Sequence, residues 1–145
     1  GADGSDPTLL HKPAGGSQMP ATQNTIDTRM HFLKMNGREI FKSAVRVMER
    51  AVRELLKKHG VSKDDVDHVI PHQANVRIVE SLAQRLEISM DKFFCNLENY
   101  GNTSAASVPL ALDEGRAQGR FHSGQLGVLV AFGAGLTWSA TLIRF

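Results

Sequence analysis

The sequence predicts an α/β protein in which helices alternate with the strands of a central sheet. Two long segments, residues 36–59 and 74–86, carry apolar residues at helical spacing. Short apolar runs near residues 68–70 and 93–98, and two β-rich runs at the C-terminus, are typical of strands. Strands that alternate with helices in this way indicate an α/β architecture.

The first 35 residues have the least regular pattern. Residues 8–12, Thr-Leu-Leu-His-Lys, are long enough for one strand. Residues 13–35 begin with a run rich in Pro, Gly, Ser, Thr and Asn, which predicts a long surface loop. A loop of this length in a compact domain often covers another part of the molecule.

An amphipathic helix is predicted from Asn36 to the glycine at position 60. Lys42, Arg46 and Arg53 take polar positions, and Gly60 ends the helix. The apolar residues at spacings of three and four are Ile40, Phe41, Ala44, Val45, Met48, Ala51, Val52, Leu55 and Leu56.

A capped turn and a buried strand follow this helix. Ser62 with Asp65 three residues later predicts the cap, and residues 68–70 predict the strand. A second helix is expected over about 74–86. Its inward residues should be Val76, Val79, Leu82, Ala83 and Leu86.

The last third of the chain supplies more strands and one more helix. Residues 93–98 predict a strand that ends before Gly101, and residues 102–119 predict a helix opened by small residues. Two β-rich runs flank Gly133-Ala134-Gly135, which indicates an antiparallel pair joined by a tight turn.

Composition narrows the class of function. The chain has 145 residues, of which 41% are hydrophobic and 22% charged, as in soluble globular proteins. Seventeen basic and fifteen acidic residues give a net charge of +2, which argues against nucleic acid as a partner. The apolar C-terminal run is broken by glycines, so no membrane span is expected. A single cysteine excludes an internal disulfide and fits the reducing cytoplasm.

The start of the chain has no signal-peptide pattern and no initiator methionine. We expect a chain that is processed, trimmed or part of something longer.

Two polar residues stand at equivalent strand-to-helix corners. His72 follows the strand at residues 68–70, and Asn102 follows Gly101, which permits a sharp turn. Each has an ordinary structural alternative: the histidine closes a strand, and the asparagine caps a helix. At such corners α/β proteins gather binding groups. If both side chains donated a hydrogen bond to one carbonyl oxygen, they would stabilise an oxyanion or enolate. Each such donor typically lowers the activation free energy by about 3 kcal/mol.

Cys95 and metal binding are the other chemical candidates. No histidine or acid lies at ligand spacing from His72, so no metal is expected. Cys95 lies inside a predicted strand, where a thiol is usually a small buried hydrophobe. A nucleophile needs an exposed electropositive corner, which argues against a triad of Cys95, His72 and Asn102.

Three motifs resemble the C-terminal half of beta-ketoacyl-acyl-carrier-protein synthase III. They are PHQANVRI at 71–78, NYGNTSAASVPLALDE at 99–114 and AFGAGLTWSATLIRF at 131–145. The resemblance extends over residues 1–145. It implies a thiolase-like fold, in which this chain forms part of the C-terminal αβα half, with a mixed sheet and helices on both faces. One histidine with a later Gly-Asn-Thr-Ser distinguishes this pattern from thiolases and elongating synthases, which use two histidines.

The resemblance also implies a reaction. It is the decarboxylative condensation of an acyl-CoA primer with malonyl-acyl-carrier protein, in which His72 and Asn102 hold the malonyl thioester carbonyl. The loop at Phe132, Gly133 and Ala134 would supply a backbone donor to a second oxyanion. The residues implied to line a tunnel for the pantetheine arm are Met35, Ile40, Phe41, Ala74 and Asn75.

Partners follow from the same resemblance. Lys42 and Arg77 would meet the acidic carrier protein; without the resemblance, an ordinary solvated face is the preferred explanation of such basic residues. No separate cofactor is implied, because the substrates carry the phosphopantetheine. The nucleophilic cysteine belongs to an N-terminal half that this chain lacks, and the complete enzyme is expected to be a homodimer.

Two hypotheses from different functional classes stay open. The chain is either part of a catalyst or a non-catalytic thiolase-like fragment that binds carrier protein or CoA. A third possibility is a synthase III relative in secondary metabolism. In either class we expect a chain that is not a free-standing domain, with an open sheet edge that invites pairing.

Overall fold

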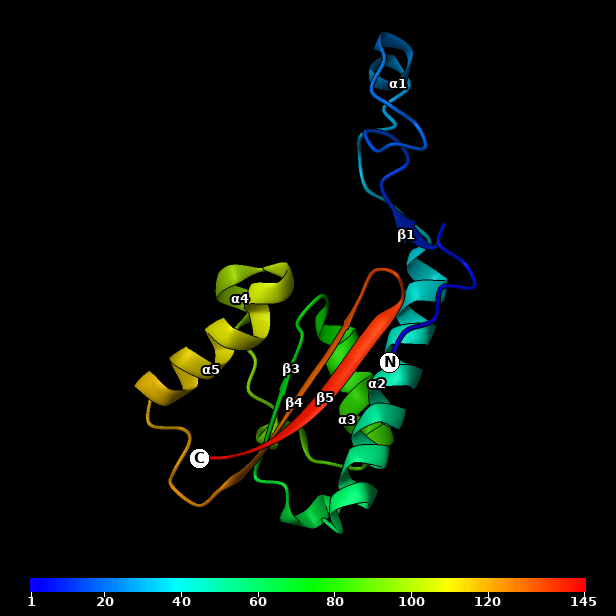
Figure 1. Ribbon diagram of the computed structural model, residues 1–145. Helices are drawn as coiled ribbons and strands as arrows, with labels where there is room; N and C mark the ends of the chain where they lie inside the picture. Colours follow the sequence, from blue (N-terminus) through cyan, green and yellow to red (C-terminus); the bar gives the residue numbers. More distant parts are fainter.

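The computed structural model describes residues 1–145 and contains a mixed three-stranded sheet (Figure 1). Strand β3 (His68–Pro71) runs parallel to β4 (Leu126–Gly133), and β4 pairs antiparallel with β5 (Thr137–Arg144). The order in the sheet is β3-β4-β5. The C-terminal hairpin and the strand before His72 are therefore confirmed.

Helices cover both faces of this sheet. Helices α2 (Gly37–His59) and α3 (Val76–Leu86) pack together on one face, and α5 (Ser107–Ala117) lies beside β3 on the other (Figure 1). Successive residues of β3 point to opposite faces, so Val69 joins the core under α2 and α3 while Ile70 packs against Ala111 of α5. The predicted mixed sheet with helices on both faces is confirmed.

The long helix has the predicted ends. Asn36 caps α2 by accepting a hydrogen bond from the Glu39 N–H at 3.3 Å. Gly60 ends the helix in the left-handed conformation with φ 64°, which favours glycine. Ser62 and Asp65 then form a capping box around a short 3₁₀ turn, η1 (Lys63–Asp65). Hydrophobic spacing and capping residues were sufficient to locate this segment.

The strand predicted over residues 93–98 is wrong. The 3₁₀ turn η2 (Met90–Lys92) precedes Phe93, which forms an isolated bridge with Val69. The chain then enters the short helix α4 (Leu97–Tyr100). The carbonyl of Asn96 accepts the N–H groups of Asn99 and Tyr100 at 3.1 and 3.3 Å. These local bonds replace the ladder that a longer strand would form.

The second helix begins later than predicted, and Val76 does not face inward. Asn75 caps α3 and Val76 is its first residue, with half of its surface exposed. Ile78 is buried instead, together with the expected Val79, Leu82, Ala83 and Leu86. Val76 keeps helical spacing with the buried Val79 and Ala83, but as the first residue of the helix it lies at the exposed end.

Residues 13–35 contain more structure than the predicted loop. They include the short helix α1 (Gln23–Asp27) and the strand β2 (Lys34–Met35), which pairs antiparallel with β1 (Leu10–His11). Figure 1 shows this segment as an arm that extends away from the sheet. The exposed large apolar residues of the arm are Met19, Ile26, Phe32, Leu33 and Met35.

The edge of the sheet is only partly covered. Ala2 forms an isolated bridge with Thr137, and the Asp3 N–H donates to the Leu136 carbonyl at 2.8 Å. Strand β5 is otherwise an edge strand, in keeping with the expected open edge. None of the helices combines the length and apolar character that crossing a membrane requires.

Truncation of a core side chain of α3 should strongly destabilise the fold. Leu82 is 0% exposed, so Leu82→Ala should lower the free energy of unfolding by about 2–5 kcal/mol. Leu33→Ala, at a position 68% exposed, is the matched control and should change it by less than about 0.5 kcal/mol. Urea denaturation measures both values, and equal effects of the two variants would contradict this description of the core.

Candidate active site

His72 lies where β3 ends. Its backbone N–H donates to the Val130 carbonyl at 2.7 Å, the last link between this segment and β4. The half-buried side chain places Nδ1 2.6 Å from Ser107 Oγ, at the start of α5. The imidazole is therefore held between the carboxyl end of a strand and the first turn of a helix.

The predicted strand before Asn102 is absent, and Asn102 instead follows the short helix α4. Gly101, with φ 67°, turns the chain out of α4, and Asn102 Oδ1 then accepts the Ser104 N–H at 3.0 Å. The Asn102 side chain is exposed, and its Nδ2 makes no hydrogen bond within this chain. The amide oxygen thus performs a capping role while the amide nitrogen stays available as a donor.

Ser104 connects the two corners. It begins the 3₁₀ turn η3 (Ser104–Ala106) and adopts a left-handed conformation with φ 52°, a strain of roughly 1–3 kcal/mol for a residue with a side chain. Its carbonyl oxygen lies 3.0 Å from the Ser107 hydroxyl oxygen and against the His72 ring. Asn102, Ser104, Ser107 and His72 therefore form one polar cluster.

Sequence reasoning missed Ser104 and Ser107. Both were included only in the run of small residues that opens the third predicted helix. The available signal was the run of hydroxyl residues directly after Asn102, since Ser107 is buried and a buried hydroxyl needs a partner.

Burial sets the protonation of His72. Loss of solvent lowers the pKa of this imidazole below its ordinary value of 6.5, and the Ser104 carbonyl acts in the opposite direction. The contact to Ser107 allows two neutral tautomers. If the Ser107 hydroxyl donates to Nδ1, the proton stays on Nε2; if it donates to the Ser104 carbonyl, Nδ1 carries the proton.

Gln73 is a buried polar residue beside this cluster. Its side chain is 1% exposed, and Oε1 accepts the Asn96 N–H at 2.8 Å. Gln73 Nε2 is buried without a hydrogen-bond partner in this chain. Burial of an unpaired amide group costs about 1–3 kcal/mol. Sequence reasoning noted Gln73 only as part of the motif after His72.

Of the three predicted loop residues, Phe132 and Gly133 lie at the end of β4, and Ala134 begins the turn that follows. Phe132 is buried in the core, and Gly133 is the last residue of the strand, paired with Thr137. The exposed Ala134 directs its carbonyl to the Thr137 hydroxyl at 3.2 Å. Because β3 and β4 are parallel, this turn follows β4 at the same end of the sheet as His72 (Figure 1).

The residues implied to line a tunnel do not gather at one cavity. Ala74 and Asn75 are exposed before α3, and Asn75 Oδ1 caps the Arg77 N–H at 2.9 Å. Met35 is exposed on the arm, whereas Ile40 belongs to the hydrophobic core. Phe41 of this set lines a groove between α2 and α3.

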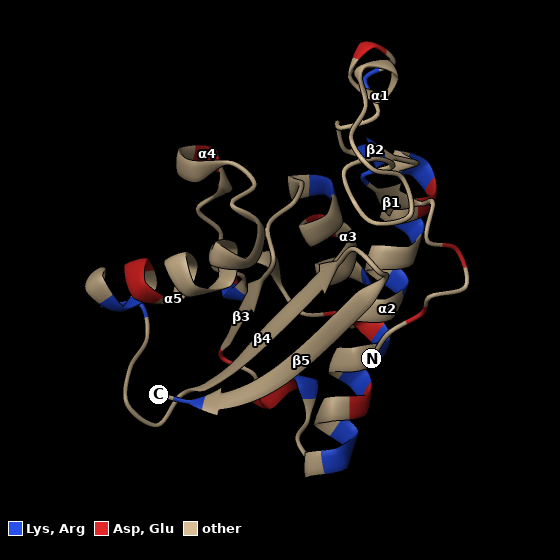
Figure 2. Cartoon of the chain, turned by 45° about the horizontal axis from the view of Figure 1, so that its top comes forward, with Lys and Arg blue, Asp and Glu red and all other residues tan.

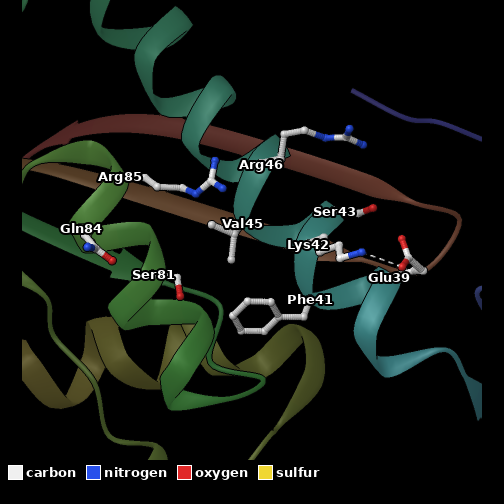
Figure 3. A pocket seen from close by; sticks show the side chains of 9 residues that line it. All are labelled: Glu39, Phe41, Lys42, Ser43, Val45, Arg46, Ser81, Gln84 and Arg85. Atoms are coloured by element: carbon white, nitrogen blue, oxygen red, sulfur yellow. Dashed lines mark hydrogen bonds and ion pairs between the residues drawn. The ribbon is translucent and has the colours of Figure 1, made fainter.

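That groove lies between α2 and α3 and has a volume of about 500 Å³ (Figure 3). Neither His72 nor Asn102 lines it. The nine lining residues are Glu39, Phe41, Lys42, Ser43, Val45, Arg46, Ser81, Gln84 and Arg85.

Charge in the groove is mostly basic but partly paired. Lys42 Nζ is 2.9 Å from Glu39 Oε1, and Arg85 Nη1 is 3.1 Å from Glu49 Oε2. Figure 2 shows Lys and Arg interspersed with acids along α2, while β3, β4 and most of β5 carry no such charge. Arg77 lies on the first turn of α3, outside the groove.

Cys95 has the environment of a core residue. Its side chain packs against the main hydrophobic core, and burial raises the pKa of the thiol to about 11. The thiol therefore stays protonated at neutral pH, which argues against a nucleophilic role. No three His, Cys, Asp or Glu side chains are arranged to hold a metal ion.

The mixed sheet between helices, with polar donors at the carboxyl end of β3, defines the class: an α/β protein with a thiolase-like fold. Crystal structures of 3-oxoacyl-(acyl carrier protein) synthase III from Pseudomonas aeruginosa and Aquifex aeolicus share this fold, with TM-scores of 0.87 and 0.85. Their sequence identities to this chain are 36% and 46%. Each match covers 100% of this chain and 42% of the solved one.

Sequence comparison gives the family. Residues 56–145 match the family described as 3-Oxoacyl-[acyl-carrier-protein (ACP)] synthase III C terminal, and the chain belongs to this family. Beta-ketoacyl-[acyl-carrier-protein] synthase III of Natranaerobius thermophilus is 51% identical over all 145 residues, and that of Caldanaerobacter subterraneus subsp. tengcongensis is 48% identical. The chain covers 44% of the length of each relative.

The buried imidazole should titrate below the ordinary value for histidine. We expect an NMR titration of the folded protein to give His72 a pKa below 6.5, because burial disfavours the imidazolium form. The unfolded chain then binds the proton first, so stability should fall as the pH is lowered below about 6.5 and level off below the folded-state pKa. A measured pKa at or above 6.5 would contradict the described environment.

Proposed function

We propose that this chain supplies the decarboxylation site of a beta-ketoacyl-acyl-carrier-protein synthase III. The observation that carries the proposal is the polar cluster in which His72 and Asn102 are both tied to the Ser104–Ser107 turn. Each side chain keeps a nitrogen free: Nε2 of His72 and Nδ2 of Asn102. Two such donors can hold one thioester oxygen.

The proposed reaction starts from a malonyl thioester. The bond between the carboxylate and the α-carbon breaks, carbon dioxide leaves, and the electron pair forms an enolate whose oxygen the two donors stabilise. The enolate carbon then attacks an acyl thioester on the cysteine of the N-terminal half. The cysteine thiolate leaves, and a 3-ketoacyl thioester remains. The turn at Phe132, Gly133 and Ala134 would donate to the oxyanion of this second step.

Neutral His72 suits this role. Donation of a hydrogen bond from Nε2–H to the thioester oxygen requires the tautomer in which the Ser107 hydroxyl donates to Nδ1. Burial disfavours the imidazolium form, which supports a neutral donor at physiological pH. The fixed contact to Ser107 would also hold the ring in one orientation during the reaction.

The partners of the proposed enzyme follow from the length and the surface of the chain. The rest of the relatives' length would include the N-terminal half and the first two strands of the C-terminal half, and it would cover the exposed Leu110 of α5 and complete the sheet edge at β5. A homodimer of the complete enzyme, a cytoplasmic location and thioesters of CoA or carrier protein belong to the same proposal. Only the assembled enzyme would bring the pantetheine to the five residues proposed to line its tunnel: Met35, Ile40, Phe41, Ala74 and Asn75.

A non-catalytic binding fragment is the alternative from another class. The strained Ser104 and the desolvated His72 favour the catalytic proposal, because a passive surface would not require them. A relative acting in secondary metabolism would share the same site and differ in its substrates.

Removal of either donor should impair decarboxylation in the assembled enzyme. His72→Ala and Asn102→Ala should each lower the rate of carbon dioxide release from malonyl thioester by about 10²–10³-fold. Acyl transfer to the cysteine should be spared, because the donors act on the malonyl group. Near-normal decarboxylation in His72→Ala, or equal loss of both steps in Asn102→Ala, would refute the assigned roles.

Charge reversal at Arg77 tests the docking of carrier protein. Arg77 is exposed at the start of α3, so Arg77→Glu should raise KM about tenfold for malonyl-carrier protein through repulsion of its acidic surface. The matching CoA thioester should react as before. Lys57→Glu, at the far end of α2, is the control for net charge. If both substrates suffer alike, the docking role is wrong.

A further inference from the structure

We infer that Gln73 is a positioning residue that fixes His72 relative to Asn102 through buried hydrogen bonds. The inference rests on the proposed function, since it concerns the geometry of the same site. Gln73 does not itself contact the reacting atoms in this assignment; it acts through the two donors.

The first part of the connection runs toward Asn102. Gln73 directly follows His72, and its Oε1 accepts the Asn96 N–H at 2.8 Å. Asn96 starts α4, and its carbonyl accepts the N–H groups of Asn99 and Tyr100. Helix α4 ends at its C-cap Gly101, directly before Asn102. The side chain of Gln73, which follows His72, is therefore hydrogen-bonded to the start of the helix that leads to Asn102.

The second part runs to α5. Asn96 Nδ2 donates to Glu114 Oε2 at 2.7 Å, and the Gln73 backbone N–H lies 3.4 Å from Ser107 Oγ. Glu114 and Ser107 lie two turns apart on the same helix. Gln73 and Asn96 therefore each contact α5. The same helix carries the Ser107 hydroxyl that contacts His72.

A polar side chain at the buried position 73 supports a positioning role. Methionine would fill a similar volume without burying the unpaired Nε2. A hydrogen-bonded pair that is shielded from water holds its geometry more firmly than an exposed pair, because water does not compete for its partners. Burial of Gln73 thus costs free energy at Nε2, which has no partner. It also shields from water the hydrogen bond that Oε1 accepts from the Asn96 N–H.

The test compares matched glutamine substitutions in the assembled enzyme. Gln73→Met should lower the decarboxylation kcat by about ten- to a hundredfold with little change in KM, because the two donors lose their fixed separation. Acyl transfer to the cysteine should change by less than about twofold, since that step does not use the donors. Gln73→Glu keeps an oxygen acceptor for the Asn96 N–H and should recover part of the lost rate.

Gln125→Met is the matched control. Gln125 Oε1 also accepts a backbone N–H, that of His122 at 2.8 Å, but just before β4, at the opposite end of the sheet from His72. Both reaction steps should be unchanged in this variant. Should Gln73→Met not fold, Gln73→Asn keeps an amide that is too short to reach Asn96, and the same split between the two steps is expected.

Three results would overturn the inference: equal loss of both steps, loss no greater than in Gln125→Met, or no recovery in Gln73→Glu. His72→Ala in the same assay separates this failure from failure of the proposed function. Normal decarboxylation in His72→Ala refutes the proposed function itself. Strong loss in His72→Ala with normal Gln73→Met refutes only the positioning role.

Discussion

The hydrogen bond between His72 Nδ1 and Ser107 Oγ is the interaction on which the rest of the site depends. It joins the end of β3 to the first residue of α5, two elements that the main chain separates by more than thirty residues. Ser107 also contacts the carbonyl oxygen of Ser104, and the Ser104 N–H donates a hydrogen bond to Asn102 Oδ1. One hydroxyl therefore orients the imidazole and ties it to the turn that holds the amide.

The apolar sheet provides the rigid frame for this polar cluster. Val69 and Ile70 of β3 are buried on opposite faces, and pairing with β4 from His68 to Pro71 sets the register of the strand. The strand therefore delivers His72 to a fixed place. The same packing desolvates the ring and keeps it neutral. Stability and chemistry are linked here, because the burial that locates the histidine also selects the protonation state that the proposed reaction requires.

Sequence patterns predicted those parts of the fold that local rules determine. The α2 helix follows from its apolar spacing and Gly60, and the β4–β5 hairpin follows from two β-rich runs around Gly133 and Gly135. The predicted strand at 93–98 failed because the local hydrogen bonds of Asn96 override the β-propensity of Phe93 and Phe94. The place of His72 at the end of a strand was predicted correctly, whereas the strand predicted before Asn102 is absent and only the motif around Asn102 supports its selection. The connections of these two residues through Ser107 and Gln73 were not predicted, since these contacts depend on how distant elements pack.

The most direct test is a crystal structure of the complete enzyme with a non-reactive malonyl thioester analogue bound. The account predicts that the thioester oxygen lies about 3 Å from both His72 Nε2 and Asn102 Nδ2. It also predicts that Ser107 Oγ stays in contact with His72 Nδ1. An analogue bound with its thioester oxygen in contact with neither nitrogen, or with only one of them, would contradict the central claim that the two corners serve a single oxyanion.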